Sequence, residues 1–221
     1  MLQLMTAYER LYSAFGPQHW WPGESPFEIM VGAVLVQNTA WRNVERAIRN
    51  LHDACVIQPH ALYALPVEEL AELIRPAGYF QVKARRLSNL LKLVVEEYDG
   101  KLEEMFAVDP TVLREQLLAV HGIGPETADA IMLYAGGLPT FVVDTYTHRV
   151  LARHGWVGYD ASYHEIKELC ESSLPTDAAL YNEYHALLVR VGKEYCRRAA
   201  PKCEACPLAE MLPSSGVCQP N

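Results

Sequence analysis

The 221-residue sequence contains no stretch that approaches the roughly 18 apolar residues needed to cross a bilayer. Its first residues, MLQLMTAYERLYSAF, have no basic start of the kind that opens a secretory signal peptide. Internal repeats and low-complexity tracts are also missing. These absences argue against a membrane-spanning or fibrous protein, and they predict a cytoplasmic protein without a membrane partner.

Positive charge is also scarce, since the formal net charge is −8. This balance argues against a partner bound by bulk electrostatic attraction. Two confined basic groups nevertheless stand out, one formed by Lys83, Arg85 and Arg86 and the other lying within residues 186–202. Either group could contact a polyanion or belong to an ordinary solvated surface.

Extended structure is nearly absent from the pattern, because only TFVV (140–143) suggests a strand. Apolar residues recur at three-to-four spacing through most of the chain, and half of all residues are apolar, enough to form a substantial core. The sequence therefore predicts an all-α protein. The Gly/Pro-rich segment AGGLPT (135–140) is the expected boundary between two lobes.

One turn in this helical pattern indicates a site. In VHGIGPETADAIMLY (120–134), Gly122 and Gly124 separate two helical segments. Glycine lets another chain approach closely, and the exposed N–H groups at the start of a helix suit an anion such as phosphate. An ordinary helix–helix corner explains the turn equally well.

The surrounding segment resembles a known family. LLAVHGIGPETADAIMLYAGGLPTFVVDTYTHRV is similar to the helix-hairpin-helix, Gly/Pro-rich loop and catalytic aspartate of the endonuclease III superfamily of DNA glycosylases. The resemblance runs from about Phe27 to Cys206 and includes FEIMVGAVLVQNTAW and a cysteine pattern near the end.

The resemblance implies two helical lobes. Residues 27–137 would form a six-helix domain with the hairpin, and residues 1–26 and 138–221 would form a discontinuous second domain. The implied partner is double-stranded DNA with one damaged base flipped out, bound by a monomer. Gly122 and Gly124 would contact a DNA phosphate, with a monovalent cation on the hairpin carbonyls.

The resemblance assigns the chemistry to Asp144, whose carboxylate would face the sugar of the flipped nucleotide and stabilise positive charge there. The alternative role of Asp144 is an N-cap for the next helix, and both roles are compatible. Members that also cleave the strand carry a lysine in the second hairpin helix, whereas this chain has Glu126, which cannot form an imine. The sequence therefore predicts a monofunctional glycosylase. Glu126 would either support catalysis or simply favour the helix start.

Two segments in the N-terminal part of the chain indicate which base is removed. QHWWPGESPFE and VLVQNTAWRNVERAI resemble the branch that removes alkylated purines, so Trp20 or Trp21, together with Trp41, would stack on the flipped base. Aromatic rings suit a cationic methylated purine. The open alternatives are tryptophans that only pack the core, and a glycosylase that removes thymine or uracil opposite guanine. Ala33 stands where the adenine-removing branch has a glutamate, which disfavours that branch.

Further DNA contacts follow from the same resemblance. Gln37 and Asn38 would fill the gap left by the flipped base, or form a polar helix end. The loop GYFQVKA (78–84) resembles one that inserts a wedge, for which Tyr79, Phe80 or Gln81 would serve. Lys83 and Arg85 would meet phosphates.

The cysteines near the end follow a metal-binding pattern. Cys196, Cys203 and Cys206 are spaced C-x6-C-x2-C, and in the family this spacing and a fourth cysteine ligate a [4Fe–4S] cluster. Leu212 replaces the family's fourth cysteine, so Cys218 becomes the candidate. Zinc and disulfides are the less favoured alternatives. Two other function classes stay open: a DNA-binding module without catalysis, and an iron–sulfur electron carrier.

Overall fold

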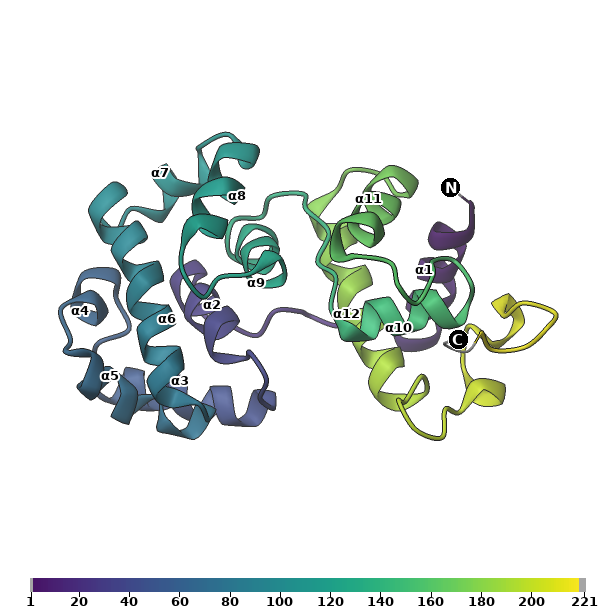
Figure 1. Ribbon diagram of the computed structural model, residues 1–221, viewed down its shortest axis with the longest axis horizontal. Coiled ribbons are helices and arrows are strands. Elements are labelled where there is room, and N and C mark those ends of the chain that lie inside the picture. The colour runs from purple at the N-terminus through teal and green to yellow at the C-terminus, as the bar shows by residue number, and fades with distance from the viewer. Residues whose placement is uncertain (1, 219–221) are drawn as a thin grey trace. The chain divides into compact units, whose positions relative to one another are not determined.

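The computed structural model describes residues 2–218, and no strand occurs among them, which confirms the all-helical class (Figure 1). The segment TFVV, which hints at extended structure but is too short to found a sheet, is a connection without strand pairing. None of the helices in residues 2–218 is both long and apolar enough to cross a membrane.

The chain divides into two compact units. Unit 1 consists of Met1–Trp20 and Pro139–Asn221, and unit 2 of Trp21–Leu138. The second crossing lies one residue beyond the expected one, whereas the first lies between Trp20 and Trp21 rather than at residues 26 and 27. The two adjacent tryptophans therefore belong to different units.

Unit 2 is built around one apolar helix. Ser25 caps this helix by accepting a hydrogen bond from the Glu28 N–H, and Pro26 occupies its first turn. Every residue from Met30 to Leu35 is buried, as expected of a central helix that is apolar all round. The helices of unit 2 are α2 (Pro26–Leu35), α3 (Trp41–Asp53), α4 (Pro59–Tyr63), α5 (Val67–Leu73), α6 (Phe80–Lys92), α7 (Leu102–Phe106), α8 (Pro110–Ala119) and α9 (Pro125–Ala130). The last turns after α6 and α9 widen into π-helices, at Leu93–Glu97 and Ile131–Ala135, and Arg75–Ala77 forms a short 3-10 helix.

Unit 1 is arranged around α12 (Ala178–Glu194), against which α1 (Leu2–Phe15) and α10 (Thr145–Arg153) pack. Asp144, Ser162 and Asp177 cap α10, α11 (Tyr163–Ser173) and α12, each accepting a backbone N–H in the first turn. Two short 3-10 turns, Cys203–Ala205 and Ala209–Met211, shape the C-terminal loop.

Candidate functional site

The hairpin joins α8 and α9, and a buried ion pair connects the two helices. The Asp129 side chain on α9 is fully buried, and its two oxygens accept hydrogen bonds from Arg114 on α8 at 2.7 and 3.1 Å. A bidentate arginine–carboxylate pair fixes orientation as well as distance. The hairpin therefore presents its turn from a rigid base.

The two glycines of the turn differ in their surroundings. Gly122 has a φ of +99°, and a Cβ there would lie 2.3 Å from the Cγ of Arg86. Gly124 has a φ of −94°, is exposed, and has no atom within 4 Å of the place a Cβ would take. The fold thus requires glycine at 122, whereas at 124 it leaves open space beside the backbone.

Side chains from α6 and from the turn after α2 support the hairpin turn. Gln37 donates to the Gly122 carbonyl at 3.3 Å and to Thr127 Oγ1 at 2.9 Å, and its own oxygen accepts from Arg86. Asn89 donates to the His121 carbonyl at 3.0 Å. The amide of Gln37, expected to face DNA, is therefore bonded to the hairpin, and two hairpin carbonyls already accept side-chain donors. Nothing in the sequence singled out Arg86 or Asn89 for this role.

Lys83 does not lie where it could meet a phosphate, so that prediction is wrong. Its side chain is 2% exposed, and its Nζ donates to the carbonyls of Leu35 and Ala77, both at 2.8 Å. Burial, with a smaller contribution from the nearby charge of Arg86, lowers the pKa of Lys83 to about 8. Lys83 thus donates to the carbonyl of the last residue of α2, whereas Arg85 is exposed.

The loop before α6 displays an aromatic side chain. Gly78 and Tyr79 both have positive φ, +68° and +46°, and Tyr79 is 74% exposed. Phe80 lies under the Arg75 guanidinium, 4.4 Å from the ring centre. Gln81 is exposed, as is Asn38, which has a φ of +54°. Of the three wedge candidates, Tyr79 is the large side chain that the backbone holds in solvent.

Two of the three predicted pocket tryptophans lie together in unit 2. The rings of Trp21 and Trp41 are edge to face with centres 5.1 Å apart, and Tyr134 lies 5.2 Å from Trp21 on another side. Gly32 on α2 lies beside both rings, since a Cβ there would lie 3.4 Å from Trp21 and 3.6 Å from Trp41. Trp20, in unit 1, is instead edge-on to His185 at 6.4 Å. Tyr134 joins this aromatic group without having been singled out in the sequence.

Asp144 is the N-cap of α10, as one of its two interpretations predicted. Its Oδ1 accepts the Thr147 N–H at 2.7 Å, and its Oδ2 lies 3.7 Å from Nε2 of His185 on α12. Burial opposes ionisation, yet the facing His185 ring and the Thr147 N–H lower the pKa of Asp144 overall. A largely enclosed carboxylate that stays ionised is suited to stabilising positive charge. Glu126, by contrast, is exposed in the first turn of α9.

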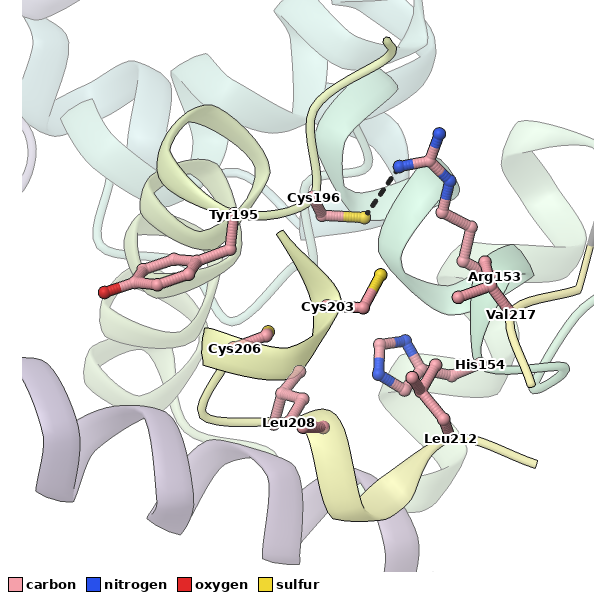
Figure 2. A pocket seen from close by; sticks show the side chains of 10 residues that line it. Arg153, His154, Tyr195, Cys196, Cys203, Cys206, Leu208, Leu212 and Val217 are labelled. Atoms are coloured by element: carbon pink, nitrogen blue, oxygen red, sulfur yellow. Dashed lines mark hydrogen bonds between the residues drawn. The ribbon is translucent and has the colours of Figure 1, made fainter. Parts of the chain in front are cut away.

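The C-terminal loop brings three cysteines to one pocket, which Figure 2 shows. Cys196, Cys203 and Cys206 line it, none of them in a disulfide, and Arg153 donates to the Cys196 sulfur at 3.4 Å. Burial raises the pKa of Cys206, so its thiolate form would need a cation nearby. Leu212 also lines the pocket, in the place where the family pattern has a cysteine.

Cys218 returns to the edge of this pocket. Its N–H donates to the Arg153 carbonyl at 3.0 Å, its carbonyl accepts from the Tyr159 hydroxyl at 2.8 Å, and its neighbour Val217 lines the pocket. Its sulfur lies over Gly155, 3.3 Å from where a Cβ of that glycine would be. The insertion after Cys206 thus brings Val217 to the pocket, whereas Cys218 is not among the lining residues, and its role as the fourth ligand stays a prediction.

The cysteine spacing suits a cluster better than a single ion. Zinc bound by thiolates at about 2.3 Å would hold sulfurs about 4 Å apart. Within residues 2–218, the only three metal-binding atoms of this kind lying within 4.8 Å of one another belong to Glu24, Glu28 and His52. No three cysteine sulfurs of these residues lie that close together, and the observation in favour of a cluster is that three cysteines line one pocket.

The chain is similar to known DNA repair proteins along most of its length. A family model described as HhH-GPD superfamily base excision DNA repair protein matches residues 31–176. A protein of Methanocaldococcus jannaschii, named as a candidate DNA repair glycosylase, is 46% identical over 205 residues, covering 92% of each chain. Endonuclease III of Thermotoga maritima is 30% identical over 181 residues, covering 82% of this chain and 79% of its own.

Solved structures agree with these relatives. A non-covalent endonuclease III–DNA complex superposes with a TM-score of 0.80 at 25% identity, over 96% of both chains. The 3-methyladenine DNA glycosylase MagIII of H. pylori, bound to 1,N6-ethenoadenine, superposes with a TM-score of 0.75 at 28% identity, over 87% of this chain and 98% of its own.

Proposed function

The chain belongs to the HhH-GPD superfamily of base excision DNA repair proteins and is a DNA glycosylase of that family, and on this premise we propose that it is a monofunctional glycosylase that removes alkylated purines from double-stranded DNA. The observation that carries the proposal is Asp144, a largely enclosed carboxylate held ionised at the start of α10.

Hydrolysis of the N-glycosidic bond develops positive charge on the deoxyribose as the base leaves. Asp144 stabilises that charge and orients the attacking water, whose proton its carboxylate accepts. A carboxylate already fixed by Thr147 and His185 needs no reorganisation when the charge forms.

The absence of a lysine nucleophile supports hydrolysis without strand cleavage. Glu126 is exposed at the first turn of α9, where the sequence pattern of strand-cleaving members has a lysine. A carboxylate cannot form a Schiff base with the sugar, so the product is an abasic site in an intact strand.

The aromatic group of Trp21, Trp41 and Tyr134 supports a purine substrate. N3- and N7-methylated purines carry positive charge, which the faces of electron-rich rings attract. Trp20 lies in unit 1 against His185 and is not part of this aromatic group. The likeness to MagIII, a glycosylase solved with a purine derivative bound, agrees with this substrate class.

DNA contacts come from the hairpin and the loop before α6. The Gly124 backbone is open to a phosphate, and Tyr79 is the wedge that fills the stack when a nucleotide leaves it. Asn38, exposed at its turn, is the better-placed contact to the orphaned base, because Gln37 is bonded to the hairpin.

A [4Fe–4S] cluster, when bound, supplies a structural cross-link among loop segments distant in sequence. Cys196, Cys203 and Cys206 hold it, with Cys218 as the fourth ligand. Arg153 would place a hydrogen-bond donor beside the Cys196 sulfur. Cys196 and Cys203, by holding such a group, would fix the basic segment between them, which contains Arg197, Arg198 and Lys202.

A panel of duplexes tests the function. Each contains one of 3-methyladenine, 7-methylguanine, hypoxanthine, uracil opposite guanine or thymine opposite guanine, and released base is measured under single-turnover conditions. We expect release of the methylated purines, strand breaks only after hot alkali, and loss of at least about a hundredfold in rate for Asp144→Asn. Release of only the pyrimidines would instead assign mismatch repair, and undiminished activity of Asp144→Asn would overturn the role of this residue.

A further inference from the structure

A buried histidine faces the carboxylate on which the proposed function depends. His185 lies on the inward face of α12 and is 5% exposed. Its Nε2 is 3.7 Å from Asp144 Oδ2, and the side-chain exposures of the two residues are 6% and 13%. A polar ring in such a position costs stability unless it interacts with a partner, and the partner here is the carboxylate.

The two oxygens of Asp144 are held from different helices. Thr147 on α10 donates its backbone N–H to Oδ1 at 2.7 Å, which is an ordinary N-cap contact. His185 on α12 faces Oδ2. A cap needs only the first contact, so the second has to be explained by something other than helix capping.

Other charged or titratable side chains of α10 and α12 near this pair are directed elsewhere. His148 faces the ring of Tyr159, and Arg149 donates to the carbonyls of Cys196 and Gly192. Lys193 lies by the Tyr146 ring, Glu183 accepts the Gln18 N–H, and Arg190 is bonded to Glu194 and stacked on Phe15. Trp20, packed edge-on against His185, carries no charge. His185 is thus the titratable group directed at the carboxylate from these helices.

Resting on the proposed function of Asp144, we propose that His185 is a positioning residue that keeps this carboxylate anionic and in one orientation for attack on the sugar. Burial alone would favour the neutral acid, which cannot stabilise a cation. The contact from His185 opposes that effect without His185 touching DNA. Trp20 fixes the ring of His185 in turn, which gives this tryptophan a role from within unit 1.

The direction of the pH effect follows. A carboxylate whose pKa is lowered is active above that pKa, so the acid limb of the rate profile lies at low pH in the wild-type protein. Removing His185 removes a contact that favours the anion, so the pKa of Asp144 rises and the limb moves to higher pH by roughly one unit. Activity at pH 8 falls much less than activity at pH 4.

The test measures base release from a 3-methyladenine duplex between pH 3 and 9, with spontaneous release subtracted, for the wild type, His185→Gln and His185→Leu. We expect the acid limb to shift to higher pH in both variants. The shift should be smaller for glutamine because its amide can still donate a hydrogen bond. Tyr184→Leu, which removes a buried neighbour on α12, is the packing control and should lower stability without moving the limb. A uniform loss of rate at every pH, or an unshifted limb, would show that His185 is only structural.

A second readout needs no substrate. The 13C signal of the Asp144 carboxyl, assigned by its loss in Asp144→Asn, is titrated in the free wild-type protein and in His185→Gln. We expect titration below the ordinary range of aspartate in the wild type and a rise in the variant. Equal titration in both proteins overturns the inference even if Asp144 proves catalytic, whereas an active Asp144→Asn overturns the proposed function instead.

Discussion

At the scale of single residues, one hairpin glycine is required by the fold and the other is available for contact with DNA. Gly122 meets Arg86 and adopts a positive φ, whereas Gly124 faces open space with an ordinary φ. The same substitution at the two positions therefore has different consequences, although the sequence motif treats the two glycines alike.

We expect Gly124→Ala to leave the free energy of unfolding within about 0.5 kcal/mol of wild type, because the added methyl meets no protein atom. Affinity for duplex DNA should fall by about tenfold, since the methyl occupies the approach of a phosphate. Gly122→Ala should lose about 1–3 kcal/mol of stability through strain and the clash with Arg86. Chemical denaturation and fluorescence anisotropy measure the two effects. Unchanged DNA affinity of Gly124→Ala would exclude this turn as the phosphate contact.

Two basic residues of α6 provide a second contrast. Lys83 is buried on carbonyl oxygens, whereas Arg85 is exposed. Lys83→Met should lower the free energy of unfolding by about 1–3 kcal/mol, because two buried carbonyls lose their donor. Arg85→Ala should leave stability unchanged and reduce the salt dependence of DNA affinity by about one phosphate contact. Titrations of DNA binding against salt decide the point, and a flatter salt dependence for Lys83→Met would contradict the buried role.

At the scale of elements, α6 supports its neighbours with side chains along one face, and the loop before it exposes an aromatic side chain to solvent. Lys83, Arg86 and Asn89 follow each other at three-residue spacing and support α2 and the hairpin turn. Tyr79, just before the helix, is held in solvent by a left-handed backbone. The helix thus links the predicted wedge to the predicted phosphate site within unit 2.

We expect Tyr79→Gly to keep the free energy of unfolding within about 1 kcal/mol of wild type, because glycine accepts the positive φ that tyrosine adopts at a cost. The variant should release base several-fold more slowly from a paired duplex and less so from a mismatched one, where extrusion is easier. Gln81→Ala, exposed in the same loop, serves as control. Equal slowing by both variants would remove Tyr79 from the wedge role.

Some features of the fold and of the site could be predicted from the sequence, and others could not. The helical pattern, the Asp144 cap and the hairpin turn were predictable because they depend on local periodicity, capping chemistry and glycine. Lys83 was misassigned although it shares the apolar stripe of Ala84, Leu87, Leu90 and Leu91, a pattern that indicates burial. His185 and Arg86 carried no local signal, because their roles depend on contacts between helices far apart in sequence.

At the scale of the whole molecule, the cysteines of the pocket all belong to unit 1. We expect purified protein to absorb near about 400 nm, as iron–sulfur thiolate sites do. Cys203→Ser should abolish this absorbance and weaken hydrogen-exchange protection in α10 and α12, which flank the pocket, while α2 and α6 keep theirs. A colourless wild-type protein, or equal loss of protection in both units, would contradict the assignment.

Unit 1 is assembled from two stretches of chain separated by all of unit 2, and this has a consequence for synthesis on the ribosome. α1 is translated first, but α11 and α12, against which it packs, follow more than a hundred residues later. Residues 21–138 can complete their own core while that first helix waits, its apolar face uncovered. In the nascent protein, α1 can pack only after α11 and α12 have been made. Its apolar face is exposed until then, and this is the interval in which a chaperone would protect it.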